Sequence, residues 1–223
     1  MGNEERSDTK VDEIIKVTLT GSSSVGKTNI IRRYLDNENL KNPTSTYGAS
    51  FASKLVNINN KLIQIDLWDT AGQERFLSLG KHFYRDASIV ILVYDITSQS
   101  SFEEIKTVWY PYIKEYREKG SVLALVGNNS HLFEYEEVME CKAKEYAQQI
   151  GAIFMLISSK TGDNIDLLFE TLIKQYFSIH KNLNEIKREK GETVKLSINK
   201  KKRKREIVVK FVNIKIKFEK FIY

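Results

Sequence analysis

Short apolar runs alternate with longer amphipathic segments along most of the chain. Runs rich in β-branched residues are typical of buried strands, and apolar residues spaced three and four apart are typical of helices. The predicted strands cover residues 14–20, 50–58, 62–69, 89–95, 122–126 and 153–157. The predicted helices cover residues 28–35, 101–118, 135–150 and 164–179.

The order of these elements predicts an α/β fold. Strands that alternate with helices favour right-handed crossovers, and hence a mostly parallel sheet with helices on both faces. The tight turn Asn59-Asn60 joins the second and third predicted strands, so these two strands form an antiparallel hairpin. We therefore predict a six-stranded sheet with one antiparallel edge strand. A ligand would bind at the carboxyl ends of its parallel strands.

Charge divides the chain in two. The net charge is +6, but residues 181–223 hold 15 Lys and Arg against 5 Asp and Glu, whereas residues 1–180 hold 20 against 24. A folded core with uniform charge would not divide in this way. We expect a flexible N-terminus at 1–10, a folded domain at 11–180 and a basic, disordered tail at 181–223.

Residues 21–28 form the string G-x-x-x-x-G-K-T between the first predicted strand and the first predicted helix. Glycines at both ends of such a turn let successive backbone N–H groups point inward and hold phosphate. The backbone that would surround the phosphate belongs to Ser23, Ser24, Val25 and Gly26. Lys27 adds a positive charge, and the hydroxyl of Thr28 can ligate Mg²⁺.

A second string, W-D-T-A-G-Q-E-R-F at residues 68–76, follows the third predicted strand. Asp69 at the end of that strand can hold the water shell of the metal, and the Gly72 N–H can bind a terminal phosphate. Gln73 would orient an attacking water. Thr46, in the preceding segment, would offer its hydroxyl and carbonyl to Mg²⁺ and the γ-phosphate.

The chain resembles a Ras-superfamily small GTPase of the Rab branch, over roughly residues 10–180. The strings that carry this resemblance are G-S-S-S-V-G-K-T (21–28), S-T-Y-G-A-S-F (45–51), W-D-T-A-G-Q-E-R-F (68–76), F-Y-R-D-A (83–87), L-V-Y-D-I-T (92–97) and I-S-S-K (157–160). G-A-S-F and the S-L-G segment after Gln73 lean toward the endosomal Rabs. The resemblance implies a P-loop G domain that binds GTP or GDP with Mg²⁺. Its catalytic residues would be Gln73, Lys27 and Thr46.

The resemblance also implies partners and a location. The partners would be a guanine nucleotide exchange factor, a GTPase-activating protein and Rab-type effectors. Trp68, Phe51 and Phe83 would form the aromatic patch that such effectors bind. We expect a cytoplasmic monomer, peripheral on the cytosolic face of endomembranes.

The base-binding string departs from the Asn-Lys-x-Asp pattern of the family, because residues 128–131 are Asn-Asn-Ser-His. Asn128 is retained, but His131 stands where a carboxylate would accept two hydrogen bonds from guanine. A neutral imidazole has only one acceptor nitrogen. The Lys160 stem can still lie on the base, and the N–H groups of Ser158 and Ser159 can meet the guanine O6. Two alternatives stay open: a GTP-hydrolysing switch, or a scaffold without GTP turnover.

No cysteine follows Cys141 in the sequence, so we do not expect the prenylation that Rab proteins usually carry. The basic run at 200–205 can attract an anionic membrane surface, and we do not expect a nucleic-acid partner. As a further hypothesis, residues 206–223 are translated non-coding sequence.

Overall fold

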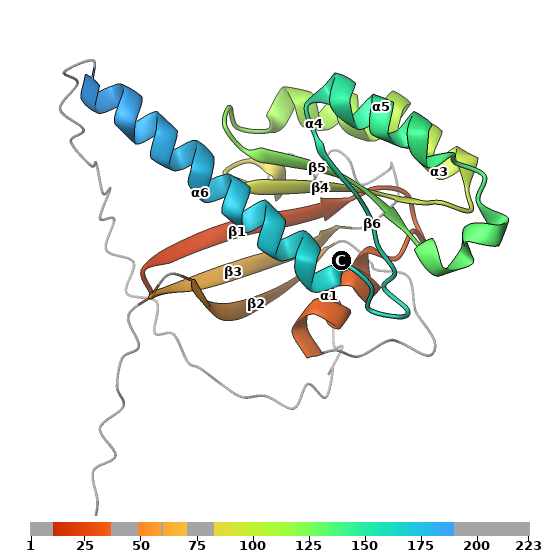
Figure 1. Ribbon diagram of the computed structural model, residues 1–223, viewed down its shortest axis with the longest axis horizontal. Helices are drawn as coiled ribbons and strands as arrows, with labels where there is room; N and C mark the ends of the chain where they lie inside the picture. The colour runs from red at the N-terminus through yellow and green to blue at the C-terminus, as the bar shows by residue number, and fades with distance from the viewer. Residues whose placement is uncertain (1–10, 37–48, 59, 71–82, 190–223) are drawn as a thin grey trace, which may run out of the picture. The chain divides into compact units, whose positions relative to one another are not determined.

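The computed structural model describes residues 11–36, 49–58, 60–70 and 83–189 of the 223 (Figure 1). The chain separates into two compact units, Met1–Glu185 and Ile186–Tyr223. The architecture described below is that of the first unit. The predictions for residues 1–10 and for the tail from residue 190 onward lie outside the described residues.

A six-stranded sheet forms the centre of the first unit, as the sequence predicted. Its strands, in spatial order, are β2 (Ala49–Ile58), β3 (Lys61–Thr70), β1 (Glu13–Thr20), β4 (Ile89–Asp95), β5 (Val122–Asn128) and β6 (Ile153–Leu156). Only the β2–β3 pair is antiparallel, and β2 lies at the edge. The fold is therefore the α/β fold of a P-loop G domain.

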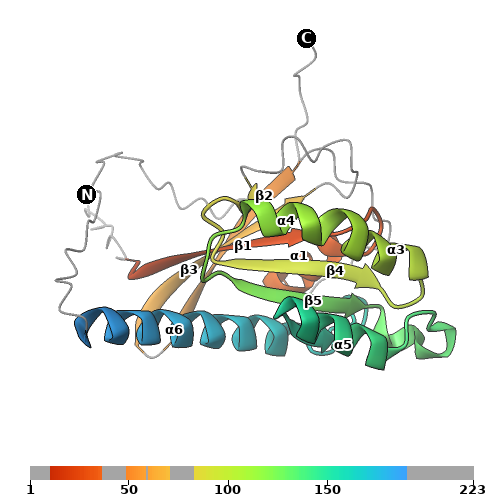
Figure 2. The same cartoon turned by 90° about the horizontal axis from the view of Figure 1, so that it is seen from above.

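Helices cover both faces of the sheet. They are α1 (Lys27–Asp36), α3 (Gln99–Glu104), the π-helix η2 (Ile105–Trp109), α4 (Tyr110–Tyr116), the 3₁₀-helix η3 (Ser130–Tyr135), α5 (Glu140–Ile150) and α6 (Ile165–Glu189). Helices α4 and α6 lie on opposite sides of strands β4 and β5 (Figure 2). None of the helices in the described ranges combines the length and apolar character needed to cross a membrane.

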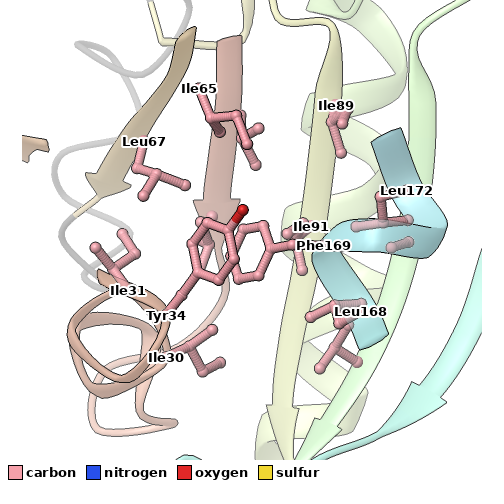
Figure 3. Close-up of a cluster of buried hydrophobic side chains, with 14 of the residues drawn as sticks. Ile30, Ile31, Tyr34, Ile65, Leu67, Ile89, Ile91, Leu168, Phe169 and Leu172 are labelled. Atoms are coloured by element: carbon pink, nitrogen blue, oxygen red, sulfur yellow. The ribbon is translucent and has the colours of Figure 1, made fainter. Parts of the chain in front are cut away.

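Strand β4 separates two hydrophobic cores, because successive side chains of a strand point to opposite faces. Ile89, Ile91 and Val93 join a core with residues of α1 and α6, whereas Val90, Leu92 and Tyr94 join a core with residues of α3, α4 and α5. In the first core, Tyr34 of α1 stacks on Phe169 of α6 with ring centroids 3.7 Å apart (Figure 3). This stack joins the helix that follows the phosphate-binding string to the last helix of the domain.

The predicted helix 101–118 is interrupted by the π-helical turn at Ile105–Trp109. Pro111, in the first turn of α4, has no N–H and its ring would crowd the carbonyl four residues earlier. A wider turn removes that conflict: the Tyr110 N–H bonds instead to the Ile105 carbonyl, five residues back. The periodicity of the apolar residues predicted the helix but not this change of pitch.

The predicted helix 135–150 begins only at Glu140, so its start was wrong. The N–H groups of Glu137 and Val138 both donate to the carbonyl of Ile96, at 2.9 and 3.1 Å, and the Val138 side chain is buried. These bonds hold the segment against the end of β4 in a non-helical conformation. Tertiary contacts therefore prevail over local helix propensity here.

The last helix continues beyond its predicted end at residue 179, and α6 reaches Glu189. The domain boundary predicted at residue 180 lies inside this helix, and the two compact units divide after Glu185. That prediction rested on the change in charge. The residues after 180 are rich in Lys, Glu, Leu and Arg, which are good helix formers, so helix and charge boundaries need not coincide.

Candidate functional site

The segments that carry the predicted site residues, as far as the structure describes them, meet at one edge of the sheet. The loop at 21–26 follows β1, Asp69 is the last residue but one of β3, Asn128 ends β5, and the loop at 157–162 follows β6. Parallel strands have their carboxyl ends at the same edge, which is where ligands bind in open α/β sheets. The sheet order β3-β1-β4-β5-β6 therefore gathers segments that are distant in the sequence.

The phosphate-binding string has the backbone conformation that its glycines were expected to allow. Gly21 and Gly26 have φ values of +140° and +93°, and Ser24 between them has +65°. A Cβ on Gly21 would lie 2.1 Å from the carbonyl oxygen of Val93, and one on Gly26 would lie 2.3 Å from Nδ2 of Asn128. No side chain fits at either glycine. The loop is thus packed closely enough for its backbone to form an anion-binding concavity.

Lys27 is only 6% exposed and holds the loop in place. Its Nζ donates to the carbonyl oxygens of Gly21 and Ser22, both at 2.7 Å. Burial lowers the pKa of Lys27 to about 8, although the nearby carboxylates of Asp69 and Glu104 oppose that shift. A buried cation of this kind gains from an anionic ligand beside it.

The predicted metal ligands Thr28 and Asp69 lie together. Thr28 Oγ1 donates a hydrogen bond to Asp69 Oδ2 at 2.6 Å, and Asp69 is 1% exposed. A hydroxyl and a carboxylate oxygen at this separation are hard donors of the kind that Mg²⁺ prefers. The pair fits a magnesium site in which Thr28 binds the ion and Asp69 holds its water molecules. Thr46, Gly72 and Gln73, the other predicted phosphate and metal contacts, lie outside the described residues.

Asn128 joins the phosphate loop to the loop after β6. It is 1% exposed, and its Nδ2 donates to the Val25 carbonyl at 2.9 Å and to Ser159 Oγ at 3.1 Å. Its Oδ1 accepts from the Ser159 N–H at 3.0 Å. The sequence predicted Asn128 as a base-binding residue, and the structure shows that it also holds the two loops together.

His131 faces this same loop. Its Nδ1 lies 2.9 Å from Ser158 Oγ, and that hydroxyl also accepts from the Thr161 N–H at 3.1 Å. Burial and the charge of Lys160 lower the pKa of His131, so the imidazole is neutral at pH 7. With Nδ1 engaged by Ser158, only the other ring nitrogen would be available for a contact with a base.

The backbone N–H groups of Ser158 and Ser159, predicted to meet the guanine O6, are already used within the protein. Ser158 N donates to the Asp163 carbonyl at 3.0 Å, and Ser159 N donates to Asn128 at the same distance. A contact with O6 through either group would require one of these bonds to open or to be shared.

Asn129 stands where the family pattern has a lysine. It adopts a left-handed conformation with φ of +67°, and its Nδ2 donates to Asp95 Oδ2 at 2.7 Å. Asn is one of the few residues that adopt this conformation readily. The amide therefore ties the base-binding segment to the end of β4.

Two further residues were missed by the sequence analysis. Glu104, at the end of α3, accepts a hydrogen bond from Ser22 Oγ in the phosphate loop. Arg33, in α1, donates to carbonyls of the loop after β6. Neither belongs to a motif, and no local signal in the sequence indicates contacts across 82 and 126 positions.

The predicted aromatic patch is assembled beside the site. Phe51 and Trp68 are paired across β2 and β3 with ring centroids 5.1 Å apart, and Trp68 lies 5.7 Å from Phe83. Phe51 is 53% exposed, and Lys16 Nζ lies 5.4 Å from the Trp68 ring centroid. A partner could therefore contact the apolar rings directly.

Comparisons with known proteins agree with this geometry. Residues 16–178 match the sequence model described as Ras family. The chain is 42% identical to mouse Ras-related protein Rab-31 over 161 residues, which are 72% of this chain and 82% of that protein. It is 39% identical to human Rab-22A over 169 residues (76% and 87%), and 35% identical to Dictyostelium discoideum Rab-2B over 171 residues (77% and 84%). The chain belongs to the Ras family of small GTPases, in its Rab branch.

Proposed function

We propose that this chain is a GTP-binding switch that hydrolyses GTP to GDP and regulates vesicle traffic on the cytosolic face of endomembranes. The observation that carries the proposal is the geometry of the phosphate loop: the buried Lys27 ammonium binds the Gly21 and Ser22 carbonyls, and the Thr28 hydroxyl donates to the buried Asp69 carboxylate. Rab-31 and Rab-22A, which cover most of this chain, support the assignment to traffic.

The chemistry proposed is in-line attack of a water molecule on the γ-phosphorus of GTP. The bond from the γ-phosphorus to the bridging oxygen of the β-phosphate breaks, which yields GDP and inorganic phosphate. The loop at 21–28 would hold the β- and γ-phosphates, and Lys27 would neutralise the charge that develops on the bridging oxygen. Gln73 would orient the water. Mg²⁺ bound by Thr28, with Asp69 behind it, would supply further charge neutralisation on the phosphates.

Slow intrinsic hydrolysis follows from the residues that this chain offers. The sequence has no arginine at a recognisable position for contact with the γ-phosphate, so a GTPase-activating protein would supply one. Release of GDP would need an exchange factor. With GTP bound, Thr46 and Gly72 would hold the γ-phosphate and order the loops on either side of the aromatic patch of Phe51, Trp68 and Phe83, which effectors would bind. We further propose a monomer that contacts anionic membrane through its basic tail.

The nucleotide released from the purified full chain tests the proposal. The protein would be denatured, and the supernatant separated by anion-exchange chromatography. Close to one guanine nucleotide per chain is expected, together with release of phosphate from added GTP in single-turnover assays. An empty site after purification in the presence of Mg²⁺ and GDP would contradict a GTP switch.

A second function, a scaffold that binds partners without GTP turnover, is favoured by the His131 contact. Guanine presents two donor groups where the family carboxylate accepts them, and the neutral imidazole has Nδ1 already bonded to Ser158. In that case partner binding would not depend on the nucleotide. A pull-down of the same partner with protein loaded with GDP, with a non-hydrolysable GTP analogue or with no nucleotide separates the two functions: equal binding in all three favours the scaffold.

A further inference from the structure

Arg33 connects the helix that follows the phosphate loop with the loop that would border the base. It lies in α1, two turns after Lys27, and its side chain is half-buried. Its Nε donates to the Ser159 carbonyl at 3.1 Å, and its Nη2 donates to the Lys160 carbonyl at 2.5 Å. One guanidinium thus binds two consecutive carbonyls of the loop after β6.

These two bonds fix the orientation of the loop backbone. The Ser159 carbonyl and the Lys160 N–H belong to one planar trans peptide unit and point in opposite directions. By holding the carbonyl, Arg33 sets the direction of the Lys160 N–H and of the side chain that follows it. The rigid fork of a guanidinium can hold two acceptors at once, whereas an ammonium is a single point charge.

The loop is shaped to receive this side chain. Gly162 has φ of +95°, and a Cβ built there would lie 3.6 Å from Cδ of Arg33, so the arginine stem packs along the loop. The Gly162 N–H in turn donates to the Ser158 carbonyl at 2.8 Å. This hydrogen bond closes the turn, and the stem of Arg33 packs against the turn.

Ser159 is held from both sides. Asn128 binds its N–H and its hydroxyl, and connects them to the Val25 carbonyl of the phosphate loop. Arg33 binds its carbonyl, and connects it to α1. The base-binding loop is thus joined to the phosphate-binding segment at two points that are eight residues apart in the sequence.

We propose that Arg33 is a positioning residue for nucleotide selectivity. It holds the loop at 158–162 at the distance from the phosphate loop that a bound purine nucleotide requires. The proposal rests on the proposed function, since it assumes that a nucleotide spans the two loops. The two bonds described for Arg33 go to loop carbonyls, so its effect on a nucleotide would be exerted through the loop. Its loss would leave phosphate binding in place and weaken the part of the affinity that depends on the base.

The test compares three variants of the full chain. Arg33→Gln removes the charge and leaves one donor nitrogen in place of three, and Arg33→Lys keeps the charge but not the fork. Arg32→Gln makes the same charge change one residue earlier in α1 and is the matched control. Dissociation constants for GDP and ADP would be measured for each by competition with a fluorescent nucleotide, and thermal melting would show whether each variant folds.

Hydrogen bonds to a charged group are strong enough for a large effect on the base loop. We expect Arg33→Gln to weaken GDP binding by about 10-fold or more and ADP binding by less than about 3-fold, with Arg33→Lys between wild type and Arg33→Gln. Arg32→Gln should stay within about 2-fold of wild type. Equal losses for GDP and ADP, or equal effects of the Arg33 and Arg32 variants, would overturn the proposal.

Hydrogen exchange distinguishes failure of this proposal from failure of the proposed function. If wild type does not bind GDP, or does not prefer it to ADP, the proposed function fails. The role of Arg33 in holding the loop is then tested by hydrogen exchange of the protein without nucleotide. The amides of residues 160–162 should then exchange faster in Arg33→Gln than in Arg32→Gln. Unchanged exchange at these amides in Arg33→Gln would overturn the positioning role. If Arg33→Gln does not fold, Arg33→Lys takes its place in the same comparison.

Discussion

Thr28 Oγ1 lies 2.6 Å from Asp69 Oδ2, although the two residues are 41 positions apart in the sequence. The bond joins the first turn of α1 to the end of β3 and places two oxygen ligands beside the phosphate loop. Thr28→Asn should therefore weaken GTP binding by about 10-fold or more relative to GDP, and should remove the dependence of GTP binding on Mg²⁺.

The measurement for Thr28 is the dissociation constant of each nucleotide at several Mg²⁺ concentrations. Thr28→Ser keeps the hydroxyl and is the control, which should stay close to wild type. If Thr28→Asn still binds GTP with the affinity and Mg²⁺ dependence of wild type, the assignment of the metal site is wrong.

Gln73 is predicted to orient the attacking water. Gln73→Leu should leave the GDP and GTP dissociation constants unchanged and slow GTP hydrolysis by about 10-fold or more, because the leucine side chain cannot hydrogen-bond to water. Phosphate release under single-turnover conditions measures the effect. A wild-type protein with no hydrolysis at all would favour the scaffold instead.

His131 occupies the position of a guanine-binding carboxylate. His131→Asp should tighten GTP binding by about 2 to 3 kcal/mol and increase discrimination against ITP and ATP, because the carboxylate accepts hydrogen bonds from both donors of guanine. Isothermal titration with the three nucleotides checks this. His131→Asn, which adds no charge, is the matched control, and equal affinities of wild type and His131→Asp would mean that guanine is bound elsewhere.

The affinity of the wild-type protein for GTP should depend on pH through His131. Burial keeps the pKa of this imidazole below its ordinary value of 6.5 in the folded protein. Affinity should thus be constant from pH 7 to pH 8 and fall only at pH values below about 6.5, because the imidazolium has donors on both nitrogens. His131→Asn should lose this decline, and an identical decline in both proteins would assign it to another group.

The same depressed pKa predicts the sign of a stability effect. Well above pH 6.5 His131 is neutral in both the folded and the unfolded chain and contributes nothing. As the pH falls through 6.5 toward the lower folded pKa, the unfolded chain binds the proton first, so the folded state becomes less stable. Denaturant titrations of wild type and His131→Asn at pH 7 and pH 5.5 measure this difference.

Phe169 connects α6 to α1 through its stack on Tyr34. Phe169→Ala should lower the free energy of unfolding by about 3 to 5 kcal/mol, because it removes a ring that is 1% exposed and leaves a cavity. Phe133→Ala removes the same ring from a site that is 68% exposed and should change stability by less than about 0.5 kcal/mol. Similar losses in the two variants would mean that the core described here is not the stabilising one.

Features encoded in contiguous strings could be predicted from the sequence. The strand β4 agrees with its predicted bounds because an apolar run flanked by polar residues indicates a buried strand wherever it lies. The phosphate loop could be predicted as well, since its glycines are required by the backbone angles at Gly21 and Gly26. The sequence also placed Thr28 and Asp69 at the same edge of the sheet, because parallel strands have their carboxyl ends there, but it did not predict the hydrogen bond between them.

Features that depend on contacts between distant segments could not be predicted. The start of α5 is decided by the bonds of Glu137 and Val138 to Ile96, which no helical periodicity encodes. The N–H groups of Ser158 and Ser159 are occupied by partners that only the folded loop brings near. The sequences around Arg33 and Glu104 resemble those of exposed positions. The contacts of these two residues therefore appear only once the strands are placed side by side.

The different surroundings of the two tryptophans give the protein an internal optical reporter. The chain has two tryptophans, and Trp109 is 2% exposed in the core beneath α3, α4 and α5, while Trp68 lies in the aromatic patch between Phe51 and Phe83. Phe83 follows directly after residues 71–82, which contain Gln73. The emission of Trp68 should therefore respond to whatever approaches that patch, whereas the emission of the buried Trp109 should provide a constant background. Replacing Trp109 by Phe would leave a single tryptophan, and nucleotide exchange or effector binding could then be followed in real time through its emission, without any attached dye.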